Sequence, residues 1–332
     1  MSVLKSVDWQ WENATAGAVA GLATVSFSHP LDVVRTRFQV SDGRTSSSLP
    51  AYKNTPHALW TIARTEGFRG LYAGFYPAVI GSTISWGLYF FFYSKAKQRY
   101  SKGHQELSPG LHLASAAEGG ALVCLCTNPI WLVKTRLQLQ TPLHQTRPYS
   151  GLYDAVRTIL KEEGWAALYK GLLPGLFLQV THGAIQFTAY EELRKVLVGF
   201  RSKETEDEFS AAELLTDDIN KVDSREKDAK LQTQLTTIDY ATLGASSKLT
   251  AVLLTYPFQV IRSRLQQRPS KDGIPIYMDS WHVVKETARF EGLRGFYRGI
   301  TANLLKNVPA ASVTFVVYEN VLNMLKLARR NS

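Results

Sequence analysis

One short motif occurs three times along the chain, and this repetition limits the possible folds more than any other feature. Each copy has a proline, bases five and seven positions later and a glutamine nine positions later; the copies start at Pro30, Pro129 and Pro257. A Glu-Gly pair and then a Tyr-x-Gly element follow each copy in the same order. Such self-similarity indicates a repeat architecture. The prolines are 99 and 128 residues apart, so the sequence predicts three units of about 100 residues.

The distribution of charge predicts a membrane protein. The mean hydropathy of −0.12 is that of a soluble protein. Three windows nevertheless contain no Asp, Glu, Lys or Arg: residues 13–31, 70–94 and 171–190. A helix needs about 20 apolar residues to span a bilayer. We therefore expect an all-α membrane protein with six transmembrane helices in three pseudo-symmetric repeats, and a short surface helix after each odd-numbered helix.

The repeats also predict where the elements lie. The spanning helices are expected near residues 11–40, 75–99, 110–140, 174–197, 238–267 and 302–325. The surface helices are expected near 54–64, 153–163 and 280–290. The repeats would occupy 10–99, 108–198 and 236–326, and residues 199–235 form a polar, acidic segment that reads as a solvated linker.

Several classes of protein are not expected. The first residues resemble neither a signal nor a transit peptide, so delivery to a membrane would rely on internal signals. The net charge of +10 is divided into small clusters at the ends of apolar windows, which argues against a nucleic-acid partner. The two cysteines, Cys124 and Cys126, exclude a disulfide framework and a four-thiolate zinc site. We find no pattern of a catalytic site, a cofactor or a metal site, so an enzyme is not expected.

The proline motif, its spacing and its three copies resemble the mitochondrial carrier family over nearly the whole chain. Longer runs resemble the folate carriers within it, which are close to FAD carriers: WQWENATAGAVAG, TISWGLYFFFY, CLCTNPIWLVKTRLQLQTPLHQT and ENVLNMLK. The resemblance implies a carrier that opens one central site alternately to either side of a membrane.

The expected substrate is folate, a pterin carboxylate, and the alternative is FAD or another nucleotide cofactor. A non-transporting scaffold or an ion leak of the same fold is the remaining alternative. The resemblance also implies a monomer, an anionic lipid such as cardiolipin as partner, and the chloroplast inner envelope or, alternatively, the mitochondrial inner membrane.

The resemblance implies a gate at the proline motifs, here named gate 1. In the family the acid two positions after each proline pairs with the base of the next repeat. Asp32 is thus expected to pair with Lys134. The other acid positions hold Trp131, facing Arg262, and Gln259, facing Arg35. The nearby glutamines are Gln39, Gln138 and Gln266. Trp131 can instead be a lipid-facing aromatic.

The resemblance implies a second gate, gate 2, near the end of each even-numbered helix. Its pattern, aromatic-acid-x-x-base, is complete only in the second repeat, because the first copy lacks the acid and the third lacks the base. The candidate residues are Tyr93, Lys97, Tyr190, Glu191, Arg194, Tyr318 and Glu319. Glu319 and Lys97 form the one expected ion pair around the ring.

The substrate site of the family lies along the even-numbered helices. Counting back from the acid of gate 2 gives Gly81, Ser82, Leu178, Gln179, Lys306 and Asn307 as equivalent positions. Lys306 is the one cation among them, and a charge at membrane depth is a functional candidate unless it snorkels to an interface. Gly81 would leave room for a flat ring. His182 would either donate to an anion or contact a neighbouring helix.

Other positions carry structural alternatives. Trp86 would stack on a ring of the substrate or belong to an interfacial belt, and Glu118 would line the cavity or pair across helices. The small residues Gly17 and Gly21 would let helix backbones approach closely. The family binds anionic lipid at Tyr-x-Gly elements and at the start of the surface helices, which implies lipid at Gly74, Gly171, Gly299 and Gly151.

Overall fold

The described part of the chain is helical throughout, and it contains no strand. The computed structural model describes residues 2–42, 50, 52–101, 109–142, 148–213, 236–269 and 275–330. Six long helices carry the fold: α1 (Ser2–Val40), α4 (Phe75–Tyr100), α5 (Pro109–Leu139), α7 (Leu172–Glu213), α9 (Thr237–Leu265) and α11 (Ile300–Arg330). The predicted fold class is confirmed.

Short helices connect the long ones in each repeat. The surface helices are α2 (Thr55–Thr65), α6 (Leu152–Glu162) and α10 (Ser280–Glu291). Each is followed by a single-turn element, which is α3 (Gly67–Leu71), η1 (Trp165–Tyr169) or η2 (Gly292–Tyr297). The order long helix, surface helix, short turn, long helix therefore occurs three times, as the sequence repeat predicts.

The three surface helices bury the same two positions of the repeat. In each surface helix, the residues eight and four positions before the glutamate of the Glu-Gly pair are buried. They are Ala58 and Ile62, Ala155 and Ile159, and Val283 and Thr287. These faces pack on the proline-motif segments of the odd-numbered helices, which gives one small apolar core in each repeat. Burial of these residues fixes the surface helix against its own long helix.

The helix boundaries differ from expectation in two places. Helix α1 begins at Ser2, well before the predicted start. Helix α7 continues to Glu213, so the first part of the predicted linker 199–235 is helical. The rest of that linker, residues 214–235, lies outside the described residues.

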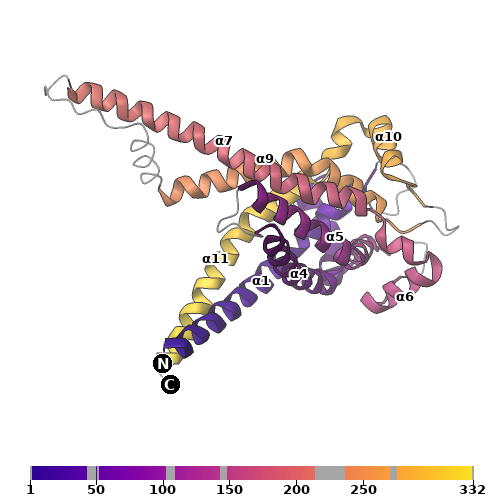
Figure 1. Cartoon of the computed structure of the whole chain (residues 1–332). Coiled ribbons are helices and arrows are strands. Elements are labelled where there is room, and N and C mark those ends of the chain that lie inside the picture. Colours follow the sequence, from indigo (N-terminus) through magenta and orange to yellow (C-terminus); the bar gives the residue numbers. More distant parts are fainter. Residues whose placement is uncertain are drawn as a thin grey trace. The chain divides into compact units, whose positions relative to one another are not determined.

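The structure divides into two compact units, Met1–Phe177 with Tyr256–Ser332, and Leu178–Thr255. Within the first unit α1 runs beside α11, and α4 beside α5 (Figure 1). A Cβ atom at Gly119 of α5 would lie 3.1 Å from the backbone nitrogen of Tyr93 in α4, so this glycine permits their close approach. The expectation for Gly17 and Gly21 is wrong, because a Cβ atom at either would meet nothing within 4 Å.

In the part of the chain that the structure describes, length and hydropathy alone mark three segments as able to cross a membrane. They are Gly67–Tyr100, Gly110–Leu139 and Ser280–Ala328. Helices α1, α7 and α9 also carry charged or polar stretches, which lower their mean hydropathy. The repeat, rather than hydropathy, reveals that these helices are equivalent to the others.

Candidate substrate site and gates

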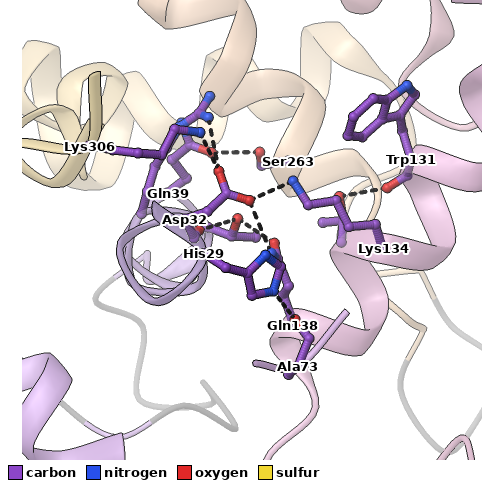
Figure 2. Close-up of polar contacts among 12 residues, drawn as sticks. His29, Asp32, Gln39, Ala73, Trp131, Lys134, Gln138, Ser263 and Lys306 are labelled. Atoms are coloured by element: carbon purple, nitrogen blue, oxygen red, sulfur yellow. Dashed lines mark hydrogen bonds and ion pairs between the residues drawn. The ribbon is translucent and has the colours of Figure 1, made fainter. Parts of the chain in front are cut away.

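The carboxylate of Asp32 is the centre of a buried polar cluster in which helices from all three repeats meet. Its side chain is 7% exposed, and Lys134 Nζ of α5 lies 2.5 Å from Oδ2, the pairing that the repeat predicts. Lys306 Nζ of α11 lies 2.6 Å from Oδ1 (Figure 2). Nη1 of Arg35 is 3.6 Å from the same oxygen. The amide of Gln138 also donates to Oδ2, at 3.1 Å. One carboxylate thus binds three cations.

The contact with Lys306 was not expected. The sequence places Lys306 midway along its helix, apart from gate 1, but it lies in the second turn of α11 and touches the gate carboxylate. With a side chain that is 22% exposed, Lys306 joins the candidate substrate site to gate 1. It faces this polar cluster rather than snorkelling away from it.

At the two other acid positions of gate 1, the facing base binds a neutral amide in place of a carboxylate. Arg35 donates a hydrogen bond to Oε1 of Gln259, the contact expected for that pair. Arg262 faces no carboxylate among the described side chains, and its Nη2 donates to Oδ1 of Asn128 at 3.2 Å. Asn128 lies one helical turn before Trp131, and the repeated motif gives no sign of this contact.

Trp131 and Gly81 pack against each other. A Cβ atom at Gly81 would lie 3.1 Å from a methyl group of Ile130 and 3.6 Å from the indole of Trp131. The space above Gly81 is therefore filled, and the expectation that it receives a flat ring of the substrate is wrong. The ammonium of Lys134 lies 5.1 Å from the centre of the indole, within the range of a cation–π interaction.

The other equivalent positions have modest contacts. The amide of Asn307 donates to the carbonyl of Asn303 on its own helix at 2.9 Å, and Ser82 is half-buried. Leu178 and Gln179 belong to the second unit. In that unit the hydroxyl of Thr255 donates to the carbonyl of Ala251. Because its one hydrogen is used there, the same hydroxyl accepts a hydrogen bond from Nδ1 of His182 at 3.1 Å. His182 thus makes the helix–helix contact that was one of its two alternatives.

A second set of ion pairs, one in each repeat and here named the outer ring, was not expected from the sequence. The base seven positions after each proline binds the acid of its own Glu-Gly pair: Arg37 to Glu66 at 2.5 Å, Arg136 to Glu163 at 3.0 Å and Arg264 to Glu291 at 2.6 Å. The three arginine side chains are 0% exposed. The signal was present, because the two motifs keep nearly constant spacing in all three repeats.

The same arginines connect neighbouring repeats. Nε of Arg37 donates to the carbonyl of Gln138 at 3.0 Å, and Arg136 and Arg264 donate to the carbonyls of Gln266 and Gln39. A hydroxyl one position earlier donates to the side-chain Oε1 of the same glutamine: Thr36 to Gln138, Thr135 to Gln266 and Ser263 to Gln39. Hydrogen bonds to the three glutamines therefore connect each repeat to the next.

Neighbouring charges change the pKa of Glu163, which lies between surface helix α6 and the short element η1. Partial burial raises the pKa of its carboxyl, but hydrogen bonds and charge from Arg136 and Lys170 outweigh burial and lower the pKa below its ordinary value of 4.5. Lys170 Nζ lies 3.0 Å from the carboxylate. Glu163 is therefore ionised at neutral pH and holds two cations.

The glycines of the Tyr-x-Gly elements have a packing role. Gly74, Gly171 and Gly299 all adopt left-handed φ angles of 71°, 77° and 83°. A Cβ atom at each would lie 2.9–3.2 Å from the carbonyl oxygen of the gate 1 base in another repeat: Lys134, Arg262 and Arg35, respectively. Only glycine satisfies both conditions without strain. This explains the three glycines without a lipid, and lipid binding there stays a prediction.

The residue before each proline links its helix to the Tyr-x-Gly element of the same repeat. A nitrogen of His29 contacts the carbonyl of Ala73 at 2.9 Å, and the hydroxyl of Tyr256 donates to the carbonyl of Arg298 at 3.0 Å. The amide of Asn128 contacts the equivalent carbonyl, that of Lys170, at 3.5 Å, and it also donates to the carbonyl of Leu168 just before the element at 2.9 Å. Side chains of three different chemistries make equivalent contacts, so simple sequence comparison does not find them.

The comparisons with known proteins agree with this geometry. The model of the family described as "Mitochondrial carrier protein" matches residues 7–104, 105–201 and 233–328. The chain belongs to the mitochondrial carrier family. It is therefore a multi-pass membrane transport protein and not an enzyme, and its three repeats are those of the family.

Several relatives cover nearly the whole carrier. It is 70% identical to "Folate transporter 1, chloroplastic" of Arabidopsis thaliana, over 97% of each chain. It is 34% identical to "Nicotinamide adenine dinucleotide transporter 1, chloroplastic" of the same species, over 94% of this chain and 91% of the relative. It is 36% identical to "Mitochondrial nicotinamide adenine dinucleotide transporter 1" of Saccharomyces cerevisiae, over 94% of this chain and 77% of the relative.

Gate 2 of the carrier differs from gate 1. Among the described side chains no ion pair joins Glu319 to Lys97, while the hydroxyl of Tyr318 donates to Asn13 at 2.6 Å and that of Tyr93 contacts His112 at 3.2 Å. In the second unit Glu191 and Arg194 are 3.9 Å apart on one helix, together with Tyr190. In a carrier that works by alternating access, the two gates close in turn, so the Glu319–Lys97 pair would form in the other conformation. This pair stays a prediction.

Two further alternatives are answered by contacts between side chains. Glu118 of α5 forms an ion pair with Arg99 of α4, so it pairs across helices. Trp86 is 63% exposed and has its ring partners, Tyr89 and Phe90, on its own helix. In the part of the chain that the structure describes, no three His, Cys, Asp or Glu residues lie close enough to hold a metal ion.

Proposed function

We propose that this carrier moves folate across an organelle inner membrane by alternating access. The observation that carries the proposal is the charge of the cluster at gate 1. Among the described residues, this cluster contains four cations, Arg35, Lys134, Arg262 and Lys306, and a single carboxylate, that of Asp32. Such an excess of positive charge at membrane depth requires water or an anion for compensation. Folate, which carries two carboxylates on its glutamate, supplies that anion, and the relative at 70% identity is named as a folate transporter.

The contact between Lys306 and Asp32 supplies a mechanism. Lys306 is at the expected substrate position and is held by the gate carboxylate at 2.6 Å. A substrate carboxylate that binds Lys306 competes with Asp32 for the same ammonium. Once Lys306 turns to the substrate, its ion pair with Asp32 is lost and gate 1 is held by fewer ion pairs. Substrate binding thereby shifts the carrier toward the state that is open at gate 1.

Polar groups at the equivalent positions would orient the rest of the substrate. The amide of Asn307 lies next to Lys306 on α11, and Ser82 of α4 is half-buried. Gln179 is the third amide or hydroxyl at these positions, and Leu178 would provide apolar contact. Amides donate and accept hydrogen bonds, which suits the pterin edge of folate.

Uptake into proteoliposomes tests the substrate. We expect labelled folate to accumulate, and FAD or NAD to accumulate much more slowly. Lys306→Ala should abolish folate uptake, because it removes the cation that the substrate carboxylate requires. Lys326→Ala, on an exposed position of the same helix, is the matched control and should transport normally. Transport of FAD or NAD without folate would replace folate by the alternative substrate class.

The same vesicles distinguish a carrier from a scaffold or an ion leak. A scaffold would move neither substrate, with or without Lys306. An ion leak would dissipate an imposed membrane potential without substrate and would not depend on Lys306. Folate uptake that saturates and is lost with Lys306→Ala excludes both alternatives.

We propose the chloroplast inner envelope as the location, since the relative at 70% identity is named chloroplastic. The mitochondrial inner membrane is the alternative. A fluorescent fusion in leaf cells decides between them by its overlap with chlorophyll fluorescence. Overlap with a mitochondrial dye alone would overturn the proposal.

We also propose an anionic lipid at the start of α6, and a monomer as the transporting species. Asn54 caps α2 and Asp279 caps α10 with hydrogen bonds to backbone amides at 2.9 and 2.7 Å, whereas Gly151 gives α6 no side-chain cap. The uncapped amides suit a phosphate. Cardiolipin should raise the melting temperature of the wild type more than that of Gly151→Asp, which adds a capping carboxylate. An equal rise in both would count against this lipid site.

A further inference from the structure

Arg262 differs from the other three cations of gate 1. Lys134, Lys306 and Arg35 all lie within 3.6 Å of the carboxylate of Asp32. Among the described residues the only hydrogen-bond acceptor of the Arg262 guanidinium is the neutral amide oxygen of Asn128, 3.2 Å from Nη2. The positive charge of Arg262 is therefore not neutralised by a nearby acid.

The cause is the replacement of the acid in the second repeat. Trp131 occupies the position from which a carboxylate would face Arg262. Its indole is fixed by packing over Gly81 and by the ammonium of Lys134. An aromatic ring cannot neutralise a guanidinium as a carboxylate does, and nothing else in the second repeat takes over this role among the described contacts.

The guanidinium is nevertheless held in a defined place. Asn128 is itself oriented, because its Nδ2 donates to the buried carbonyl of Leu168 at 2.9 Å, which directs Oδ1 toward Arg262. The guanidinium carbon lies 3.3 Å from the position of a Cβ atom at Gly175, so the absence of a side chain there provides its space. Arg262 is partly exposed, and among the described contacts its guanidinium makes a hydrogen bond through Nη2. Nε and Nη1 are therefore left to bind a ligand.

We propose that Arg262 binds a second anionic group of the substrate, while Lys306 binds the first. This inference rests on the proposed function and adds a substrate class to it, namely molecules with two acidic groups rather than one. A planar guanidinium with free N–H groups binds a carboxylate or a phosphate oxygen through two parallel hydrogen bonds. For folate, the two groups are the α- and γ-carboxylates of its glutamate. Asn128 and Gly175 are positioning residues, because they hold Arg262 without touching the substrate.

The experiment compares folate with its γ-monoamide, which has nearly the same size and one carboxylate fewer. The measured quantity is the ratio of the two KM values for uptake into proteoliposomes. The wild type should prefer folate by roughly 10- to 100-fold, the range expected for a charge-assisted hydrogen bond. Arg262→Gln should reduce the ratio toward one, whereas Arg262→Lys should keep part of it. Arg289→Gln, an exposed arginine of α10, is the control and should keep the full ratio.

A second variant tests the origin of the free charge. Trp131→Asp places a carboxylate opposite Arg262, so it should lower the preference for folate over the monoamide as Arg262→Gln does. Folate-induced thermal stabilisation of the purified protein gives an independent readout if a variant transports poorly. An unchanged KM ratio in Arg262→Gln would overturn the proposal. Absence of folate uptake by the wild type would instead reject the proposed function itself, so the two failures are distinguishable.

Discussion

At the scale of single residues, the outer ring of arginines and glutamates is the most constrained part of the carrier. Arg37, Arg136 and Arg264 have fully buried side chains, each with a glutamate partner in its own repeat and a backbone carbonyl in the next. A buried cation without its partner is strongly destabilising, typically by about 3–5 kcal/mol. These residues therefore determine whether each repeat holds its surface helix and its neighbour.

The pH dependence of the thermal stability of Glu163→Gln tests the contribution of these ion pairs. The pKa of Glu163 is below 4.5 in the folded state, so its ionised form stabilises the folded protein above that pH, and the contribution disappears as pH falls through the folded pKa. At pH 7 in detergent, the free energy of unfolding of Glu163→Gln should be about 3 kcal/mol lower than that of the wild type. Thermal denaturation measures this loss as a lower melting temperature. The difference should shrink as the solution is acidified.

Glu192→Gln is the matched control for this prediction. Glu192 also pairs with a lysine, but its side chain is 63% exposed, and exposed pairs contribute about 0–1 kcal/mol. It should melt close to the wild type at every pH. A gap between wild type and Glu163→Gln that is constant down to acidic pH would contradict the role of the carboxylate charge.

At the scale of elements, the start of each even-numbered helix is set by a glycine. Gly74 is the residue before α4, with φ of 71°, and it lies against the carbonyl of Lys134 in α5. The left-handed backbone lets the chain turn into α4, and the missing side chain lets α5 approach. The same arrangement at Gly171 and Gly299 places α7 and α11. A packing requirement of the helix pair, and not only the local turn, selects glycine.

Gly74→Ala should therefore be destabilising. The left-handed conformation costs a non-glycine residue roughly 1–2 kcal/mol, and the Cβ atom would come 2.9 Å from the Lys134 oxygen, which adds to that cost. Thermal denaturation in lipid-free detergent measures the effect without a contribution from bound lipid. Gly87→Ala is the control in the same helix, because a Cβ atom there meets nothing within 4 Å. It should be neutral or slightly stabilising, and equal losses in both variants would refute the packing explanation.

At the scale of the whole molecule, the carrier is held by contacts that run from each repeat to the next. The glutamine contacts and the arginine–carbonyl contacts are threefold, whereas the ion pairs of gate 1 are not, because only the first repeat has an acid. Asp32 therefore does alone what three carboxylates would share. The residues predicted to form gate 1 are joined by these contacts, while Glu319 and Lys97 of the predicted gate 2 are unpaired with each other among the described side chains.

Asp32→Asn should consequently lower the thermal stability of the substrate-free carrier far more than Glu319→Gln. The first change leaves the three cations around position 32 without their carboxylate, and like charges then repel one another. Removing one partner from a buried ion pair costs about 3–5 kcal/mol. Glu319 is exposed and lies at the gate that is not paired, so its replacement should have little effect. Similar losses in the two variants would argue against a carrier held mainly by gate 1.

The sequence alone determined the repeat, the number and order of the long helices, and the pairs Asp32–Lys134 and Arg35–Gln259, but not the start of α1 or the end of α7. These follow from periodic motifs, because equivalent positions in a repeat occupy equivalent places in the fold. Only the tertiary structure decided that Lys306 binds Asp32, that Trp131 fills the space at Gly81, and that Asn128 holds Arg262. Each depends on how far a side chain reaches across helices from different repeats. Motif spacing fixes which residues face one another, but not which neighbour they finally touch.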